Sequence, residues 1–391
     1  MAICQYLETA CTTLAVLVTL LVTPTMGRQL LDRQPAPAEK PHIVMLLVDD
    51  WGWANVGYHR DPPTQDVVTP NFDKLAMEGL VLDQHYAYYI CAPSRSSLIS
   101  GRLPIHVNYA DVSPDFYNPK DPVSGFMGIP RNMTGIGTKM KEAGYATHQV
   151  GKWDAGMATP DHTAEGRGFS SSFGYFHHAN DYYTEAEGKC NGTNITDLWD
   201  TDKPAHGQNG TGPDHYEEGL FREHVLDIVN NHDPSTPLFL YYAPHIVHMP
   251  YQLPQEYLDK FSFIDDELRR YYHAMVFYLD GVIGDLTDAL KRRGLWDNLL
   301  FVTSSDNGGP VSHGHGANNY PLKGGKHSSW QGGIRVNAFV SGGFLPENMQ
   351  GKKTEGYTFT WLTGMQRSVL WQVLIQQMNG QQRLICLPLT V

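Results

Sequence analysis

Apolar runs of strand length alternate with segments of helical periodicity along the central part of the chain. His42–Val48 (HIVMLLV) is a continuous apolar run, and similar runs lie at 146–150, 238–242, 299–303 and 336–341. Continuous apolar runs are typical of strands that are buried on both faces, as in parallel sheets. The pattern therefore predicts an α/β fold with a large mixed, mostly parallel sheet that is flanked by helices on both faces.

Two helices are predicted from residue spacing and end signals. Thr69-Pro70 and the following NFDKLAME place an N-cap and a proline at the start of a short helix that ends before Gly79. A long helix with Gly294 as its stop lies between the strands predicted at 238–242 and 299–303. Its apolar side chains recur at helical spacing: Tyr272, Met275, Val276, Leu279, Val282, Ile283, Leu286 and Leu290.

The two ends of the chain differ from this pattern. The apolar run Thr12–Val22 is short for a membrane span and precedes small residues, which predicts a cleaved signal peptide and no stable membrane span afterwards. The segment before it lacks Lys and Arg, so an uncleaved anchor is the alternative. Near the other end, Trp361–Met378 has the composition of an apolar helix without a partner layer. The predicted parts are a signal peptide (1–27), a Pro-rich linker (28–41), one folded domain (42–345) and a divergent C-terminal segment (346–391).

Charge and glycosylation signals narrow the class of protein. The chain has 41 acidic and 29 basic residues, a net charge of −12, which argues against a nucleic-acid partner. Four Asn-x-Ser/Thr sequons favour a glycoprotein of the secretory pathway, lysosomal or extracellular. They are centred on Asn132, Asn191, Asn194 and Asn209.

Polar residues follow each of the first four predicted strands. They are Asp49 and Asp50, Gly151 and Lys152, His245 and His248, and Asp306 and Asn307, in strand order. In open α/β sheets, ligands bind beyond the carboxyl ends of the strands, so we expect these groups to converge on one crevice. The carboxylate and amide oxygens among them suit a hard cation such as Ca²⁺ or Mg²⁺. The ordinary alternative is that such polar residues cap helices or turn loops.

A cysteine lies at a predicted helix start in the segment CAPSRSSLISGR, residues 91–102. There the Cys91 side chain would face free amide groups and the positive end of the helix dipole, with Arg95 nearby as a bidentate partner for a tetrahedral oxyanion. This arrangement predicts a nucleophile in an anion-binding site. The alternative is a buried structural cysteine or half of a disulfide, with Cys190 and Cys386 as the other cysteines outside the signal peptide.

These motifs resemble those of the sulfatase family. The family's modification signal, C-x-P-S-R followed by G-R, is present from Cys91 to Arg102, and four further stretches match in order. They are PHIVMLLVDDWGW, GYATHQVGKW, SSDNGG and PLKGGKHSSWQGG. Over roughly residues 40 to 345 the chain is most similar to the arylsulfatase B subfamily. The resemblance implies the alkaline-phosphatase-like sulfatase fold, with 42–345 as catalytic domain and the smaller C-terminal domain truncated or divergent.

The resemblance also implies a mechanism. Cys91 would be oxidised to formylglycine (3-oxoalanine) by a formylglycine-generating enzyme, and one hydroxyl of the aldehyde hydrate would attack the sulfur of a sulfate ester while the other later expels sulfate. The substrate would be an aryl sulfate or a sulfated carbohydrate of the glycosaminoglycan kind. One Ca²⁺ per chain would lie among Asp49, Asp50, Cys91, Asp306 and Asn307, and the remaining catalytic residues would be Arg95, Lys152, Lys326 and His248. His245 would be structural.

One residue departs from the family pattern. Asp154 stands where the family signature G-K-W-H-x-G has histidine. Its carboxylate could accept a hydrogen bond from the formylglycine hydroxyl or act as a base, but it adds negative charge to an anionic centre. This leaves two alternatives, a catalytically weakened protein that binds sulfated glycans and a phosphoesterase of the same superfamily. The second would need histidine ligands for two zinc ions, where this chain has Asp306-Asn307.

Overall fold

The computed structural model describes residues 40–110, 120, 123, 127–190, 193–205, 215–354 and 359–360. The predicted signal peptide, nearly all of the predicted linker, the sequons at Asn191 and Asn209, Cys386 and the apolar stretch Trp361–Met378 lie outside these residues. The chain divides into two units, 1–40 and 41–391, and the fold described below is that of the second. In the described part, no helix is both long and apolar enough to cross a membrane.

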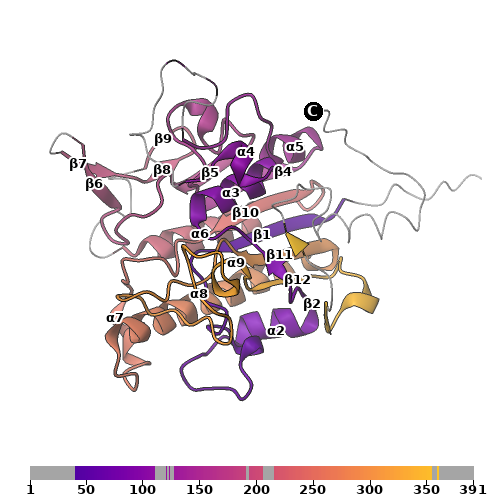
Figure 1. Ribbon diagram of the computed structural model, residues 1–391. Helices are drawn as coiled ribbons and strands as arrows, with labels where there is room; N and C mark the ends of the chain where they lie inside the picture. The colour runs from indigo at the N-terminus through magenta and orange to yellow at the C-terminus, as the bar shows by residue number, and fades with distance from the viewer. Residues whose placement is uncertain are drawn as a thin grey trace, which may run out of the picture. The chain divides into compact units, whose positions relative to one another are not determined.

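A ten-stranded sheet forms the centre of this unit, in the order β13-β2-β12-β11-β1-β10-β4-β5-β8-β9 (Figure 1). Strand β1 pairs in parallel with β10 and β11, and β4 pairs in parallel with β10 and β5, whereas β12 is antiparallel to β11. The predicted mixed, mostly parallel sheet is thus confirmed. The strands are β1 (His42–Val48), β2 (Leu80–Val81), β4 (Ala146–Lys152), β5 (Ser171–Tyr175), β8 (Trp199–Asp200), β9 (Lys203–Pro204), β10 (Leu238–Ala243), β11 (Leu299–Ser305), β12 (Ala338–Ser341) and β13 (Lys352–Lys353).

Helices cover both faces of the sheet (Figure 1). On one face lie α2 (Pro70–Glu78), α6 (Glu217–Asn231), α7 (Gln255–Asp259) and α8 (Glu267–Arg292), and on the other lie α3 (Cys91–Ser100), α4 (Pro104–Val107) and α5 (Ile136–Glu142). The smaller elements are α9 (Gln331–Ile334), η1 (Gly57–His59), η2 (Pro160–His162), η3 (Trp296–Asn298), η4 (Glu347–Met349), and the strand pairs β3 (His85–Tyr86) with β14 (Phe359–Thr360) and β6 (Ala186–Cys190) with β7 (Thr193–Thr196).

Successive residues of β1 contribute to two separate hydrophobic clusters. Val44, Leu46 and Val48 pack with α2, α6 and α8, whereas the residues between them, Ile43 and Leu47 among others, pack in the cluster on the α3 and α5 side. Each apolar side chain of β1 therefore packs in one of the two clusters, which is why the sequence of this strand is a continuous apolar run after His42.

The start of α2 differs from the sequence prediction. Thr69 occupies the N-cap position, but its side chain makes no capping bond; its hydroxyl donates to Asp73 at 3.1 Å instead. The carboxylate of Asp280 in α8 accepts hydrogen bonds from the first amides of α2, at 3.2 Å from Asn71 and 2.8 Å from Phe72. A carboxylate from another helix thus satisfies the free amides and the positive dipole end.

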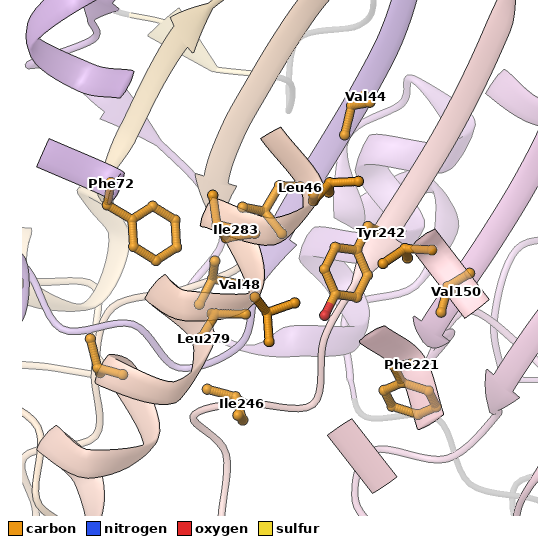
Figure 2. Close-up of a cluster of buried hydrophobic side chains, with 14 of the residues drawn as sticks. Val44, Leu46, Val48, Phe72, Val150, Phe221, Tyr242, Ile246, Leu279 and Ile283 are labelled. Atoms are coloured by element: carbon orange, nitrogen blue, oxygen red, sulfur yellow. The ribbon is translucent and has the colours of Figure 1, made fainter. Parts of the chain in front are cut away.

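The packing of α8 on β1 allows a prediction about stability. Figure 2 shows Ile283 of α8 among the core side chains near Leu46, and Ile283 is wholly buried. Ile283→Ala should lower the free energy of unfolding by about 2–5 kcal/mol, because it leaves a cavity in a closely packed core. The matched control is Leu268→Ala on the same helix, where the side chain is 37% exposed and a change within about 0.5 kcal/mol is expected. Urea unfolding of both variants measures this, and equal losses would contradict the packing described.

Candidate active site

The polar residues that follow the parallel strands lie together. Because β1, β4, β10 and β11 run in parallel, their carboxyl ends meet at one edge of the sheet. The structure brings Asp49 and Asp50 beside Lys152, His248, Asp306 and Asn307 there, and all six are buried. Lys326 reaches the same place from the loop after β11. The site is therefore assembled from segments far apart in sequence.

Cys91 is the first residue of α3 and is only 2% exposed. Its thiol donates to Asp49 Oδ1 at 3.4 Å, and Asp50 Oδ1 lies 4.0 Å away. It is a free cysteine, so it is not half of a disulfide. Burial and the carboxylates of Asp306 and Asp49 raise the pKa of the thiol well above its usual value. Unmodified Cys91 is thus a neutral thiol and a poor nucleophile.

Two lysines neutralise the aspartates at the end of β1. Lys152 Nζ lies 2.6 Å from Asp49 Oδ2, and Lys326 Nζ lies 2.7 Å and 2.9 Å from the two oxygens of Asp50. Burial is the largest single influence and would raise the pKa of Asp49, but the ammonium of Lys152 and the other positive groups nearby, Arg95 among them, together lower the pKa to about 2. Lys326 likewise lowers the pKa of Asp50 against the effect of burial. Both carboxylates are therefore ionised at every physiological pH.

Arg95 is placed differently from the open anion-binding fork that the sequence suggested. Its Nε and Nη2 both donate to Asp306 Oδ2, at 3.0 Å and 2.8 Å, and its Nη1 donates to the carbonyl of Lys152 at 3.3 Å. A fully buried guanidinium needs an opposite charge and several acceptors, which Asp306 and this carbonyl supply. Arg95 thereby fixes Asp306, whose other oxygen accepts from the amide of Asp50 at 3.2 Å.

The donor set at this edge fits a hard divalent cation. One ligand atom from each of Asp49, Asp50, Cys91 and His248 lies within 4.8 Å of the others. Asn307 Nδ2 donates to Asp50 Oδ1 at 2.7 Å, while the buried Asn307 Oδ1 has no hydrogen-bond partner. Leaving such an oxygen unpaired costs roughly 1–3 kcal/mol. A cation among these carboxylate and amide oxygens would provide the missing partner, as in oxygen-rich calcium sites.

The two histidines after β10 have different surroundings. His248 Nδ1 donates to the carbonyl of Met249 at 2.6 Å, and Nε2 lies 3.7 Å from Asp50 Oδ2. Burial and then Lys326 lower the pKa of His248 to about 4, so the ring is neutral. His245 is wholly buried, with Nδ1 2.9 Å from Glu217 Oε2 and its ring stacked on Tyr182 at 4.0 Å. His248 thus belongs to the crevice, and His245 to its support.

The sequence did not reveal the pair of glutamates that holds this loop. Glu217 contacts His245, and Glu218 accepts from the amides of His245 and Ile246 at 2.5 Å and 2.9 Å. Both open α6 and are wholly buried. Acidic residues at a helix start are ordinarily exposed and interact with the helix dipole, so nothing in the sequence indicated that both glutamates are buried.

Backbone strain gathers around the site. Asp50, Asp154 and His327 have φ values of 55°, 47° and 69°, and they are three of the five positive-φ residues other than glycine in the described part. Such conformations persist where the surroundings enforce them, often at functional sites. Asp154 is also wholly buried, with Oδ2 3.7 Å from Lys152 Nζ. The residue that departs from the family pattern therefore lies beside the lysine of the site.

Comparisons with known proteins agree with this geometry. The sulfatase family model matches residues 41–359. Arylsulfatase J of Mus musculus is 38% identical over 308 residues, covering 78% of this chain and 48% of the relative. N-acetylgalactosamine-6-sulfatase of Rattus norvegicus is 29% identical over 342 residues, covering 85% and 62%. The crystal structure of Ps i-CgsB in complex with k-i-k-neocarrahexaose superposes with a TM-score of 0.70 at 30% identity, covering 83% of this chain and 70% of that one.

These relatives define the family and leave the subfamily open. The chain spans about half to three fifths of the length of the curated relatives just named. The names arylsulfatase J and N-acetylgalactosamine-6-sulfatase do not single out the arylsulfatase B subfamily that the sequence suggested. The fold, the order of the motifs and the match over residues 41–359 nevertheless agree. The chain belongs to the sulfatase family.

Proposed function

We propose that this protein hydrolyses the sulfate esters of sulfated sugars or aryl alcohols, with Cys91 oxidised to formylglycine and one bound Ca²⁺. The observation that carries the proposal is the place of Cys91, at the first turn of α3 and against Asp49 and Asp50, with two lysines on those carboxylates. A neutral buried thiol is a poor nucleophile, which favours a modified residue at this position.

The chain's own residues would bind and orient the anionic group. Lys152 and Lys326 supply positive charge next to residue 91, where charge develops on the transferred sulfate. Arg95 keeps Asp306 in place, and His248 directs Nε2 toward the aspartates. A formylglycine hydrate would supply the attacking hydroxyl. Ca²⁺ held by Asp49, Asp50, Asp306 and Asn307, next to residue 91, would polarise the sulfate oxygens.

The substrate class follows from the relatives. N-acetylgalactosamine-6-sulfatase is named for a sulfated amino sugar, and Ps i-CgsB was solved with an oligosaccharide. We propose a sulfated carbohydrate of the glycosaminoglycan kind, such as a sulfated N-acetylgalactosamine. The sequence resemblance to arylsulfatase B favours the 4-sulfate, and the similarity to N-acetylgalactosamine-6-sulfatase favours the 6-sulfate. The exposed sequon at Asn132 supports maturation in the secretory pathway, toward the lysosome or the exterior, with a formylglycine-generating enzyme as partner.

The test combines chemistry at residue 91 with turnover. Peptide mass analysis of the segment around Cys91 should show formylglycine, and the same material should release sulfate from an aryl sulfate and from 4-sulfated N-acetylgalactosamine. Faster release from the 6-sulfated sugar would move the assignment to that subfamily. Material that contains the aldehyde and releases no sulfate, yet binds sulfated glycans, would replace the proposal by a binding function.

Asp154 is the reason to keep that binding function as a second candidate. Asp154→His should raise kcat by about tenfold to a hundredfold, because an imidazole can donate a charge-assisted hydrogen bond worth about 1.5–3 kcal/mol to the anionic centre. Histidine also tolerates the positive φ of this position. The measurement is kcat on an aryl sulfate from pH 4 to 8, with the aldehyde content of both proteins matched.

Asp154→Asn is the matched control for this substitution. It keeps the size and the preference for a positive φ but removes the negative charge without adding an imidazole. An equal gain in both variants would assign the effect to charge removal alone. A fall in kcat in both would show that the Asp154 carboxylate has a role of its own, as base or hydrogen-bond acceptor.

A further inference from the structure

A second group of metal-ligating side chains lies outside the site described above. His177 and His178 follow β5, and Glu187 lies in β6, the first strand of the β6–β7 hairpin (Figure 1). One ligand atom from each residue lies within 4.8 Å of the other two, and all three residues are half-buried. Nothing in the proposed sulfatase chemistry uses them. Two imidazoles and a carboxylate are a donor set that suits zinc rather than calcium.

The side chains are already close to a zinc-binding arrangement. His177 Nδ1 lies 2.6 Å from Glu187 Oε1, and the rings of His177 and His178 are 4.2 Å apart at an interplanar angle of 39°. Ligands about 2.0–2.1 Å from a tetrahedral zinc lie roughly 3.3 Å from one another, so no separation between the three ligand atoms would have to change by more than about 1.5 Å.

Other residues hold the backbone that carries these ligands. The buried carboxylate of Asp197 accepts from the amides of Phe176, at 3.0 Å, and His177, at 2.8 Å. Asp181 donates its amide to the carbonyl of Ala186 at 3.0 Å, next to Glu187. The two segments are thus positioned by contacts that do not involve the three ligand side chains, as preorganised metal sites require.

We propose that His177, His178 and Glu187 form a zinc site that is separate from the group around Asp49 and Asp50. Three protein ligands leave the fourth position of a tetrahedral zinc open for water or an anion. The site adjoins the crevice, because the carbonyl of Phe176 accepts from the amide of Asp154 at 3.2 Å. A zinc ion there would add positive charge beside the residue at which this chain carries an extra carboxylate.

Isothermal titration of the full protein with ZnCl₂, in excess Ca²⁺ at pH 7, tests the site. We expect one zinc per chain. His177→Gln and Glu187→Gln should each weaken its binding at least about tenfold, as the loss of a ligand must exceed the 10–100-fold cost of losing an outer-shell partner. The matched control is His224→Gln, since His224 is also half-buried but stacks on Phe173 and belongs to neither group. It should leave the affinity unchanged.

Three outcomes would overturn the proposal. The first is the absence of zinc binding, and the second is zinc binding that both ligand variants retain. The third is zinc binding that is lost only in Asp50→Asn, which would assign the ion to the group around Asp49 and Asp50. A measurement on the unsubstituted protein guards against variants that fail to fold. Zinc should protect His177 and His178 from diethylpyrocarbonate in excess Ca²⁺ while His224 reacts as before, and equal labelling with and without zinc would reject the site.

Discussion

Cys91→Ala should reduce sulfate-ester turnover to the background of an assay without enzyme. The substitution removes the only group at this position that can be oxidised to an aldehyde, and loss of a catalytic nucleophile costs on the order of 10⁵–10⁶ in kcat. Cys91→Ser should be nearly as inactive, because a serine-bound sulfate has no second hydroxyl on the same carbon to expel it. The measurement is kcat on an aryl sulfate at saturating substrate.

The fold should survive this substitution. The hydrogen bond of the thiol to Asp49 is a long one, 3.4 Å, and the change removes a single sulfur atom. Ser96→Ala is the matched control, since Ser96 is also buried in α3, its hydroxyl has no hydrogen-bond partner, and it lies outside C-x-P-S-R. It should keep full activity and aldehyde content. Undiminished turnover in Cys91→Ala would reject the proposed nucleophile.

Removal of the divalent cation should lower kcat by at least about a hundredfold, the cost of losing one electrostatic contact to a developing charge. Without the ion, Asp49 and Asp50 repel an anionic sulfate. Lys152 and Lys326 then only balance the charges of these two carboxylates, with which they form ion pairs. Dialysis against EGTA should abolish turnover, Ca²⁺ or Mg²⁺ should restore it, and elemental analysis of the active protein should find one calcium per chain.

Two aspartate substitutions, one inside the proposed calcium site and one outside it, provide the matched pair of variants for this experiment. Asp50→Asn should weaken calcium binding, whereas Asp259→Asn, an exposed carboxylate of α7 outside the group, should not. Restoration of turnover by Zn²⁺ rather than Ca²⁺, or stoichiometric zinc without calcium in the site around Asp50, would contradict the proposal and favour a phosphoesterase.

The strands of the central sheet could be predicted from the sequence where burial on both faces produces a continuous apolar run. β1 coincides with the predicted run at both ends, because Pro41 and Asp49 flank seven residues that are all buried. The runs predicted at 146–150 and 299–303 extend two residues further, through polar residues that still pair in the sheet. β5 was not predicted, because its sequence SSFGY is neither apolar throughout nor alternating.

The sequence was enough to predict that the polar residues of the site converge, but not which contacts they make with one another. The strand-end rule was enough to place Asp49, Lys152, His248 and Asp306 in one crevice. The partner of Arg95 was not predictable, because a guanidinium in an anion site can face a ligand or a carboxylate. The choice depends on Asp306, 211 residues further along the chain.

The complete burial of α3 would set an order of events in biosynthesis if Cys91 is oxidised as proposed. All ten residues of this helix are buried, and Cys91 lies beneath Asp49 with 2% of its surface exposed. On the proposed function, an enzyme that oxidises this thiol would reach it only before the segment 91–102 folds. The active fraction of the protein would then depend on the relative rates of oxidation and folding, and folded protein with an unmodified Cys91 would stay inactive.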